Sequence, residues 1–290
     1  MTLEDLGYHP DFEEYRKKNQ LDSFGVGRVT LEHKERYVVR TAEKEYEAEI
    51  IGNLRFASRS RADFPAVGDW VATSEYDEDK VLIHAVLPRR TSIDRQAVGK
   101  RGEKQIIASN IDFAFIVQSA DRDFSINRLE RYLTICHASK VSPLIVLNKI
   151  DLADGAYIQD LISQIKDRVK QTPVFAISNK TRTGIDSLYD AMLKGKTYCL
   201  LGSSGVGKSS LVNALAGKEV MRTNAISTST SKGRHVTSHR ELLVLEQGAI
   251  LIDNPGMREV GMADSAAGLD QTFTAIVELS QDCKYKDCTH

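Results

Sequence analysis

The stretch from Tyr198 to Ser209 reads Tyr-Cys-Leu-Leu-Gly-Ser-Ser-Gly-Val-Gly-Lys-Ser, an apolar run that leads into a glycine-rich loop. Apolar residues at helical spacing follow, from Leu211 to Leu215. A strand, a Gly-x-x-x-x-Gly-Lys-Ser loop and a helix in this order form a phosphate-binding loop. The glycines let backbone N–H groups turn around phosphate oxygens, and the helix N-terminus adds partial positive charge. The pattern predicts a nucleoside triphosphate site and leaves the base open; a chance glycine-rich turn is the alternative.

Two residues of this loop have individual roles. Lys208 is placed to reach the β- and γ-phosphates, which makes it a catalytic candidate, and the Ser209 hydroxyl is placed to bind Mg²⁺. The loop residues expected to bind the nucleotide are Gly202, Ser203, Ser204, Gly205, Val206, Gly207, Lys208, Ser209 and Ser210.

A second apolar run, Ala249 to Asp253, ends in an acid and is followed by Asn-Pro-Gly256. We predict that Asp253 holds Mg²⁺ through its water shell and that the Gly256 amide senses the γ-phosphate. A plain Asn-Pro-Gly turn is the alternative. Met257 follows, where many Ras-type GTPases carry a water-orienting Gln. Because methionine cannot orient water, hydrolysis here needs another group or a partner.

The string Asn148-Lys149-Ile-Asp151 directly follows the apolar run Leu144 to Leu147 and matches the guanine signature of GTPases. A carboxylate accepts two hydrogen bonds from the N1–H and N2–H₂ edge of guanine. Adenine has no such donor pair and would leave Asp151 buried and unpaired, which argues against an ATPase. We expect the stem of Lys149 over the ring, Asn148 tying neighbouring loops together, and Ser178 beside the base.

The order of these motifs is unusual. In an ordinary GTPase the phosphate loop precedes the base reader, whereas here Asn148 precedes Gly202. Because domain termini are often close together, such a circularly permuted domain can still fold. The second switch at Asp253 then leads directly into the C-terminal segment, so a nucleotide-driven movement would be passed to that segment.

Further apolar runs indicate the architecture around these motifs. Buried strands are expected at 113–117, 143–147, 174–177, 198–201 and 249–252, with helix-length stretches at 126–138 and 158–170 between some of them. This alternation predicts a mostly parallel sheet covered on both faces. Ligands of such sheets bind at the carboxyl ends of the strands.

Upstream, from about residue 25 to 94, short apolar runs alternate with charged residues and turn signals, which predicts a five-stranded OB-type barrel. Such barrels commonly bind oligonucleotides, and a set of arginines could line one face; a solvated surface is the alternative, because acids are nearly as numerous here. These arginines are Arg55, Arg59, Arg61, Arg89, Arg90 and Arg95. The expected division is a lead-in at 1–24, the barrel at 25–97, the permuted α/β P-loop domain at 98–262 and a Cys/His segment at 263–290.

Composition supports a globular protein of two or three domains. The chain has 290 residues, is 41% hydrophobic and carries a net charge of −1, so no bulk electrostatic signal points to nucleic acid or membrane. No signal peptide and no apolar run of about 20 residues is visible, so we expect a cytoplasmic protein without a membrane partner. Cys136 and Cys199 lie in apolar stretches and are expected in the core. Nothing demands a dimer, so we expect a monomer.

Permuted motif order, a preceding barrel and a trailing Cys/His cluster together resemble one family, the ribosome small-subunit-dependent GTPase A (RsgA) family. The resemblance runs from about residue 25 to 290. The strings that carry it are Asn148-Lys-Ile-Asp151, Gly202 to Ser210, Gly233-Arg-His-Val-Thr-Ser238, Asp253-Asn-Pro-Gly256 and Cys283-x₄-Cys288-x-His290.

The resemblance implies roles for the first switch, which in the family usually reads Gly-x-His-Thr-Thr. Thr237 falls on the second threonine and would be a Mg²⁺ ligand and catalytic candidate, while Val236 replaces the first. His235 matches a histidine that the family is thought to use in hydrolysis in place of the missing Gln. A loop histidine that contacts ribosomal RNA or solvent is the alternative.

The resemblance also implies one Zn²⁺ ion, because the family site reads Cys-x₄-Cys-x-His-x₅-Cys. Cys283, Cys288 and His290 match its first three ligands, and the sequence then ends. Structural zinc normally has four protein ligands, so either the chain is truncated or the site is incomplete. A metal-free segment is the alternative.

The function that the resemblance implies is a checkpoint late in assembly of the small ribosomal subunit. GTP-bound protein would dock with its barrel on ribosomal RNA, and hydrolysis to GDP, stimulated by the subunit, would release it. Two alternatives stay open: a permuted GTPase of large-subunit assembly, and an RNA-binding module with a nearly inactive guanine-nucleotide site. The barrel and the Cys/His segment argue against the first, and Met257 keeps the second open.

Overall fold

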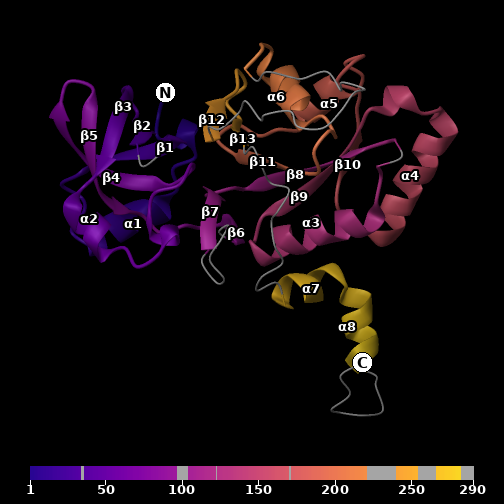
Figure 1. Cartoon of the computed structure of the whole chain (residues 1–290), viewed down its shortest axis with the longest axis horizontal. Helices are drawn as coiled ribbons and strands as arrows, with labels where there is room; N and C mark the ends of the chain where they lie inside the picture. The colour runs from indigo at the N-terminus through magenta and orange to yellow at the C-terminus, as the bar shows by residue number, and fades with distance from the viewer. Residues whose placement is uncertain are drawn as a thin grey trace, which may run out of the picture.

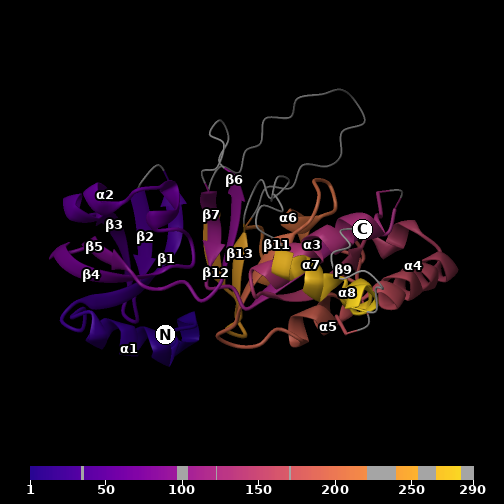
Figure 2. The same cartoon turned by 90° about the horizontal axis from the view of Figure 1, so that it is seen from below.

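A computed structural model gives the fold and describes residues 1–33, 36–96, 104–121, 123–169, 171–220, 240–253 and 266–281. A five-stranded barrel and an α/β domain lie side by side and share one eleven-stranded sheet (Figures 1 and 2). The strand order is β10-β9-β8-β11-β13-β12-β1-β2-β3-β5-β4, and an additional pairing of β4 with β1 closes the barrel.

The barrel confirms the predicted OB-type architecture. Strand β3 shows the simplest pattern, because Tyr46, Ala48 and Ile50 are buried in the barrel core while the glutamates between them are exposed. The other strands pack apolar residues into the same core. The barrel strands are β1 (Gly25–His33), β2 (Arg36–Arg40), β3 (Glu45–Ile50), β4 (Trp70–Asp77) and β5 (Lys80–Val86).

The N-terminal lead-in docks on the barrel. It forms the short helix η1 (Glu4–Leu6) and helix α1 (Pro10–Lys18). Leu6 and Phe12 are buried beside Trp70 of β4, with no more than 2% exposed. Between β3 and β4 the chain forms α2 (Gly52–Ala57) and η2 (Arg61–Asp63).

The α/β domain is built on parallel strands, as predicted, with helices on both faces. Alternate residues of β8 point into different apolar clusters: Ala114 and Ile116 pack on the side of α3, and Phe115 and Val117 pack on the side of α5 and α6. Figure 1 shows the sheet between these helix layers. The strands are β8 (Phe113–Ser119), β9 (Ser142–Asn148), β10 (Val174–Ala176), β11 (Thr197–Leu201), antiparallel β12 (Arg240–Val244) and β13 (Ile250–Asp253). The helices are α3 (Ile126–Ala138), η3 (Ile150–Leu152), α4 (Gly155–Arg168), α5 (Ile185–Asp190) and α6 (Lys208–Ala216).

Two details sharpen the sequence predictions. Helix α4 begins at Gly155 rather than near Ile158, because the Asp154 side chain caps it by accepting a hydrogen bond from the Tyr157 amide at 2.8 Å. Cys136 and Cys199 are fully buried in the core, as expected, and burial raises the pKa of the Cys199 thiol to about 12.

The remaining elements connect or extend the α/β domain. A separate hairpin of β6 (Ser92–Gln96) and β7 (Lys104–Ser109) follows the barrel. Helix α7 (Ala266–Thr272) packs against α3, where His137 Nδ1 lies 3.0 Å from Thr272 Oγ1, and α8 (Thr274–Gln281) extends away from the body (Figure 1). Within the described residues, no helix has the length and apolar character that crossing a membrane requires.

Arg28 of β1 joins the barrel to the α/β domain. Its side chain is fully buried and donates four hydrogen bonds: Nε to Gly68 O at 3.1 Å, Nη1 to Leu6 O at 2.6 Å and to Thr197 Oγ1 at 2.9 Å, and Nη2 to Asn110 O at 3.0 Å. Burial lowers the pKa of Arg28 to about 10, opposed by Asp112 and Asp69, so the guanidinium stays charged near neutral pH.

Arg89 corrects one prediction about the barrel surface. Its guanidinium turns inward to the fully buried carboxylate of Asp69, with Nε and Nη2 at 2.8 and 2.7 Å from the two carboxylate oxygens, and it also donates to Phe64 O. A buried carboxylate needs such a partner, so Arg89 is not available to an external face. Of the other candidate arginines, Arg95 has a side chain outside the described residues, and Arg55, Arg59, Arg61 and Arg90 are exposed.

We expect Arg28→Met to lower the free energy of unfolding by about 3 kcal/mol or more, because it leaves several buried acceptors without a hydrogen-bond donor. Urea-induced unfolding followed by circular dichroism measures this loss. Arg36→Met, at an exposed position of β2, is the matched control and should change stability by less than about 0.5 kcal/mol. Equal stability of the two variants would contradict a structural role for Arg28.

Candidate nucleotide site

The predicted phosphate loop wraps the N-terminus of α6. Strand β11 ends at Leu201, the glycine loop follows, and the helix begins at Lys208. Gly202, Gly205 and Gly207 have φ values of 148°, 81° and 96°, a region that side chains rarely adopt. A Cβ at Gly202 would lie 2.4 Å from the carbonyl oxygen of Val117. Only glycine fits here, and the resulting loop presents backbone amides at a helix N-terminus.

The charged groups of the phosphate region converge on this loop. Lys208 Nζ donates to the carbonyl oxygens of Gly202 and Ser203 at 2.7 and 2.6 Å, so its ammonium lies over the loop. Ser209 lies in the first turn of α6. Asp253 is 7% exposed at the end of β13, which pairs in parallel with β11 and so brings this carboxylate to the same sheet edge. A hydroxyl and a carboxylate are oxygen donors of the kind that Mg²⁺ prefers, and they fit that ion.

The base reader lies at the carboxyl end of β9. Lys149 follows Asn148 with a positive φ of 61°, and its Nζ pairs with Asp121 Oδ2 at 3.0 Å. Ser178 Oγ donates to Asp151 Oδ1 at 2.6 Å, which orients the carboxylate predicted to read guanine. Ser178 thus lies beside Asp151, and its predicted position beside the base stays a prediction.

Two asparagines connect the base reader to the phosphate loop. Asn148 Nδ2 donates to Val206 O at 2.7 Å, and Asn179 Nδ2 donates to Gly207 O at 3.0 Å. The Asn179 amide also donates to Asn148 Oδ1 at 3.3 Å. A Cβ at Gly207 would lie 2.3 Å from Asn148 Nδ2, so the loop approaches the base reader closely. No sequence motif reveals the bond from Asn179 to the loop.

Two further residues escaped sequence reasoning because no motif marks them. Asp121 orients Lys149; burial alone would raise the pKa of Asp121, but hydrogen bonds from Ser119, the Asp123 amide and Lys149 lower it. Arg128 of α3 donates to Ser203 Oγ at 2.9 Å and pairs with Asp123 at 2.9 Å. Helix α3 is therefore tied to the phosphate loop.

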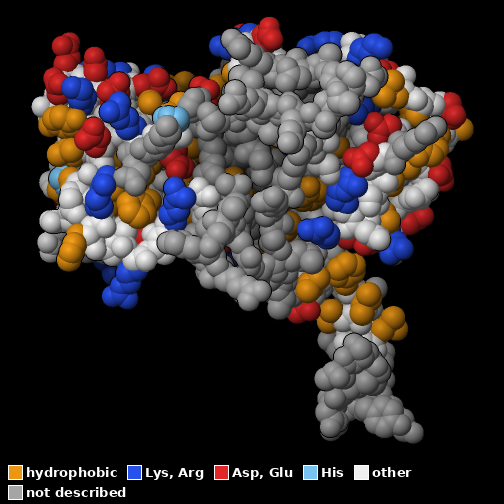
Figure 3. All heavy atoms as spheres, in the orientation of Figure 1, with side chains coloured by type: hydrophobic (Ala, Val, Ile, Leu, Met, Phe, Trp, Pro, Cys, Tyr) orange, Lys and Arg blue, Asp and Glu red, His pale blue; other side chains and the backbone are white. Residues whose placement is uncertain are grey.

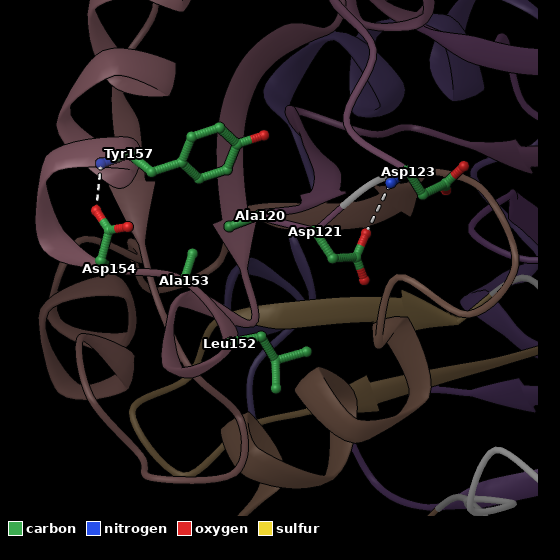
Figure 4. A pocket seen from close by; sticks show the side chains of 7 residues that line it. All are labelled: Ala120, Asp121, Asp123, Leu152, Ala153, Asp154 and Tyr157. Carbon is green, nitrogen blue, oxygen red and sulfur yellow. Dashed lines mark hydrogen bonds between the residues drawn. The ribbon is translucent and has the colours of Figure 1, made fainter.

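An open pocket of about 730 Å³ adjoins the base reader on the side of Asp121. In Figure 4, Asp121 and Asp123 lie on one side, while Asp154 and Tyr157, from the start of α4, lie on the other. Its lining residues are Ala120, Asp121, Asp123, Leu152, Ala153, Asp154 and Tyr157. None of them is a predicted site residue, so the pocket borders the nucleotide site without being its centre.

Several predicted site residues lie outside the described part of the chain. These are the switch residues His235, Thr237 and Gly256 and the zinc candidates Cys283, Cys288 and His290. Across the residues that are described, no group of three or more His, Cys, Asp or Glu side chains could hold a metal ion.

The fold and the site define a class of protein. The base reader at the end of β9 precedes the phosphate loop after β11 in the chain, yet hydrogen bonds join the two. A P-loop domain with an Asn-Lys-x-Asp string, the guanine signature of GTPases, in this order is a circularly permuted P-loop GTPase. The RsgA GTPase family profile matches residues 86–263, and the chain belongs to that family.

Individual relatives agree with this assignment. The chain is 40% identical to the small ribosomal subunit biogenesis GTPase RsgA of Opitutus terrae, with 100% of this chain and 81% of the relative aligned. It is 43% identical to the protein of the same name from Methanosarcina acetivorans, over 91% of this chain and 70% of the relative.

Solved structures share the fold. The crystal structure of YjeQ from Thermotoga maritima matches with a TM-score of 0.65 and 23% identity, covering 92% of this chain and 86% of that protein. YloQ, described as a circularly permuted GTPase, matches with a TM-score of 0.66 and 22% identity, covering 92% and 84%.

We expect Asp151→Asn to weaken GDP binding by about 150-fold or more and to favour xanthosine diphosphate, because two hydrogen bonds to a charged group are lost at about 1.5–3 kcal/mol each. Titration with fluorescent GDP and XDP measures both affinities. Asp154→Asn is the matched control: it changes the same side chain three positions later, and Asn caps α4 as well as Asp does. Unchanged preference for GDP in Asp151→Asn would remove the base-reader assignment.

Proposed function

We propose that this chain hydrolyses GTP and acts in maturation of the small ribosomal subunit. The observation that carries the proposal is the direct hydrogen bonding between base reader and phosphate loop through Asn148 and Asn179. This hydrogen bonding supports a site in which the carboxylate of Asp151 and the phosphate loop lie at the same edge of the sheet. The small ribosomal subunit is proposed as the partner because the names of the relatives include it.

In the proposed mechanism each residue of the site binds a different part of GTP. Asp151, oriented by Ser178, accepts the hydrogen bonds of guanine, and Lys149 lies over the ring, held by Asp121. Lys208 and the loop amides hold the β- and γ-phosphates. Mg²⁺, held by Ser209 and Asp253 with Thr237, would neutralise charge that develops on the transferred phosphoryl group. Gly256 would sense the γ-phosphate through its amide.

Hydrolysis also needs an oriented water molecule. Met257 lacks a hydrogen-bonding group that could do this, whereas His235 in the first switch can accept or donate a proton. We propose that His235 orients the water and that the small subunit places it. Under this assignment, slow turnover of the free protein and its stimulation by the subunit have the same cause, namely whether His235 is in place to orient the water.

Release from the subunit is proposed to follow hydrolysis. In the sequence, the second switch after Asp253 precedes α7, and α7 packs on α3. The other end of α3 contacts the phosphate loop through Arg128 and Ser203. A change at the γ-phosphate therefore has two routes to this helix pair, and movement of α7 would lower the affinity for the subunit. We further propose a cytoplasmic monomer that cycles between GTP and GDP.

One zinc ion is also proposed for the C-terminal segment. The spacing Cys283-x₄-Cys288-x-His290 supports it, and thiolates with an imidazole are the usual ligands of structural zinc. Elemental analysis of purified protein should find zinc in the unmodified chain and less in Cys288→Ser. Absence of zinc from both would favour the metal-free segment.

The decisive experiment measures GTP turnover by the purified protein alone, with small subunits and with large subunits. We expect low basal turnover that rises at least about tenfold with small subunits, because the missing water-orienting help is worth about 1.4 kcal/mol or more. Stimulation by large subunits instead would favour the alternative role in large-subunit assembly. No stimulation by either would favour an RNA-binding module with a nearly inactive site.

Two variants separate the steps of that assay. Lys208→Ala should lose turnover under every condition, because it removes the phosphate contact itself. His235→Ala should keep affinity for GTP and for the small subunit while losing the stimulated rate. A His235→Ala variant that is stimulated normally would show that this histidine has another role.

A further inference from the structure

The barrel carries two surfaces of opposite charge at its two ends. At one end lie the turns between β2 and β3 and between β4 and β5, with exposed Glu43, Asp77, Glu78 and Asp79. In Figure 3, acidic side chains crowd this end, at the top left. The exposed face of β3 continues the acidic surface with Glu45, Glu47 and Glu49. These acids are partly balanced, because Arg40 and Lys80 lie opposite Glu45 and Glu47 in neighbouring strands and Lys44 pairs with Asp79. OB-type barrels often bind nucleic acid on the face of strands 2 and 3, but here the acidic side chains still outnumber the basic ones, which makes this end less suited to phosphates than the opposite end.

The opposite end has the reverse character. The segment 52–62, Gly-Asn-Leu-Arg-Phe-Ala-Ser-Arg-Ser-Arg-Ala, contains three arginines and no acid. Arg55, Arg59 and Arg61 are exposed, as is Arg90 after β5. Among them, Phe56 of α2 is 95% exposed, the highest value among the large exposed hydrophobic side chains described. We call Arg55, Phe56, Arg59 and Arg61 the basic ridge.

Hydrogen bonds from the barrel fix the chain at the C-terminal end of the basic ridge. Arg89, anchored on buried Asp69, donates to the carbonyl oxygens of Ala62 and Phe64 and so fixes the chain that follows the ridge. Asp63, the first acid after the ridge, accepts hydrogen bonds from the Arg59 and Ser60 amides, both at 2.9 Å. These bonds lower the pKa of Asp63 and hold its carboxylate in the turn. The arginine-bearing turn that follows Phe56 is therefore fixed to the barrel.

We propose that the basic ridge binds an unpaired segment of RNA, with a base stacked on Phe56 and phosphates paired with the surrounding arginines. An exposed aromatic ring flanked by guanidinium groups has the chemistry that single-stranded nucleic acid requires, because stacking accepts any base and arginine attracts phosphate. The charge argues against a basic protein as occupant. The proposal rests on the proposed ribosomal function and adds where and how the RNA is contacted.

The test compares Phe56→Ala with Tyr76→Ala. Tyr76 is also an exposed barrel aromatic, at 51%, but it lies on the acidic end of β4. The probe is a fluorescein-labelled single-stranded RNA of ~10 nucleotides, within the usual site size of such barrels. We expect Phe56→Ala to weaken its binding by about 5- to 100-fold, the range of one lost stacking contact, and Tyr76→Ala to bind as the unmodified protein does. Equal unfolding midpoints would show that both variants are folded.

The arginines give a second, independent readout. A triple variant, Arg55→Gln with Arg59→Gln and Arg61→Gln, should reduce the slope of log affinity against log salt by about 2, since each phosphate contact on a single strand contributes about 0.7. An unchanged slope would overturn the phosphate contacts.

Sedimentation with small subunits distinguishes failure of this proposal from failure of the proposed function. If the unmodified protein neither binds small subunits nor is stimulated by them, both proposals fall. If it is stimulated while Phe56→Ala and Tyr76→Ala bind RNA and subunits equally well, only the basic ridge is overturned. Loss of subunit binding by Phe56→Ala with unchanged RNA binding would assign the ridge to a protein partner instead.

Discussion

The buried guanidinium of Arg28 is the constraint on which the arrangement of the two domains depends. A charge removed from water is tolerated only where hydrogen bonds replace its hydration, and here the acceptors come from four separate segments of the chain. One of them is Thr197, at the start of the strand that leads into the phosphate loop. Another is Gly68, whose added Cβ would lie 2.2 Å from Ser109 O, so barrel and hairpin meet there without side chains between them. The barrel is thus fixed relative to the loop.

Permutation leaves the nucleotide site intact because the site is held by contacts between strand ends rather than by chain order. Strand β8 lies between β9 and β11 in the sheet, and the three run in parallel, so their carboxyl ends meet at one edge. Across that edge, the amide groups of Asn148 and Asn179 reach the backbone of the phosphate loop. These bonds do not depend on which motif comes first in the chain, so the permuted order preserves them.

Sequence was most informative where a residue's role is local. Apolar runs located the parallel strands, and glycine spacing located the loop whose positive φ values exclude side chains. It was least informative where partners are distant. Strand β1 is hard to recognise in the sequence, because its buried positions include Arg28 and Thr30, which break the apolar pattern. Arg89 was placed on the surface because nothing in its neighbourhood reveals the buried carboxylate of Asp69, twenty residues earlier.

The shared sheet also decides how barrel and nucleotide site communicate. Strand β1 belongs to the closed barrel and pairs with β12 through Leu31 and Glu241. Strand β12 in turn pairs with β13, setting Glu241 opposite Asp253. Only one strand therefore separates the barrel from the strand that ends in the proposed magnesium ligand. A flexible linker would let the barrel bind its partner without effect on the nucleotide. In a continuous hydrogen-bonded sheet, by contrast, any displacement of β1 would either move β12 or break its ladder.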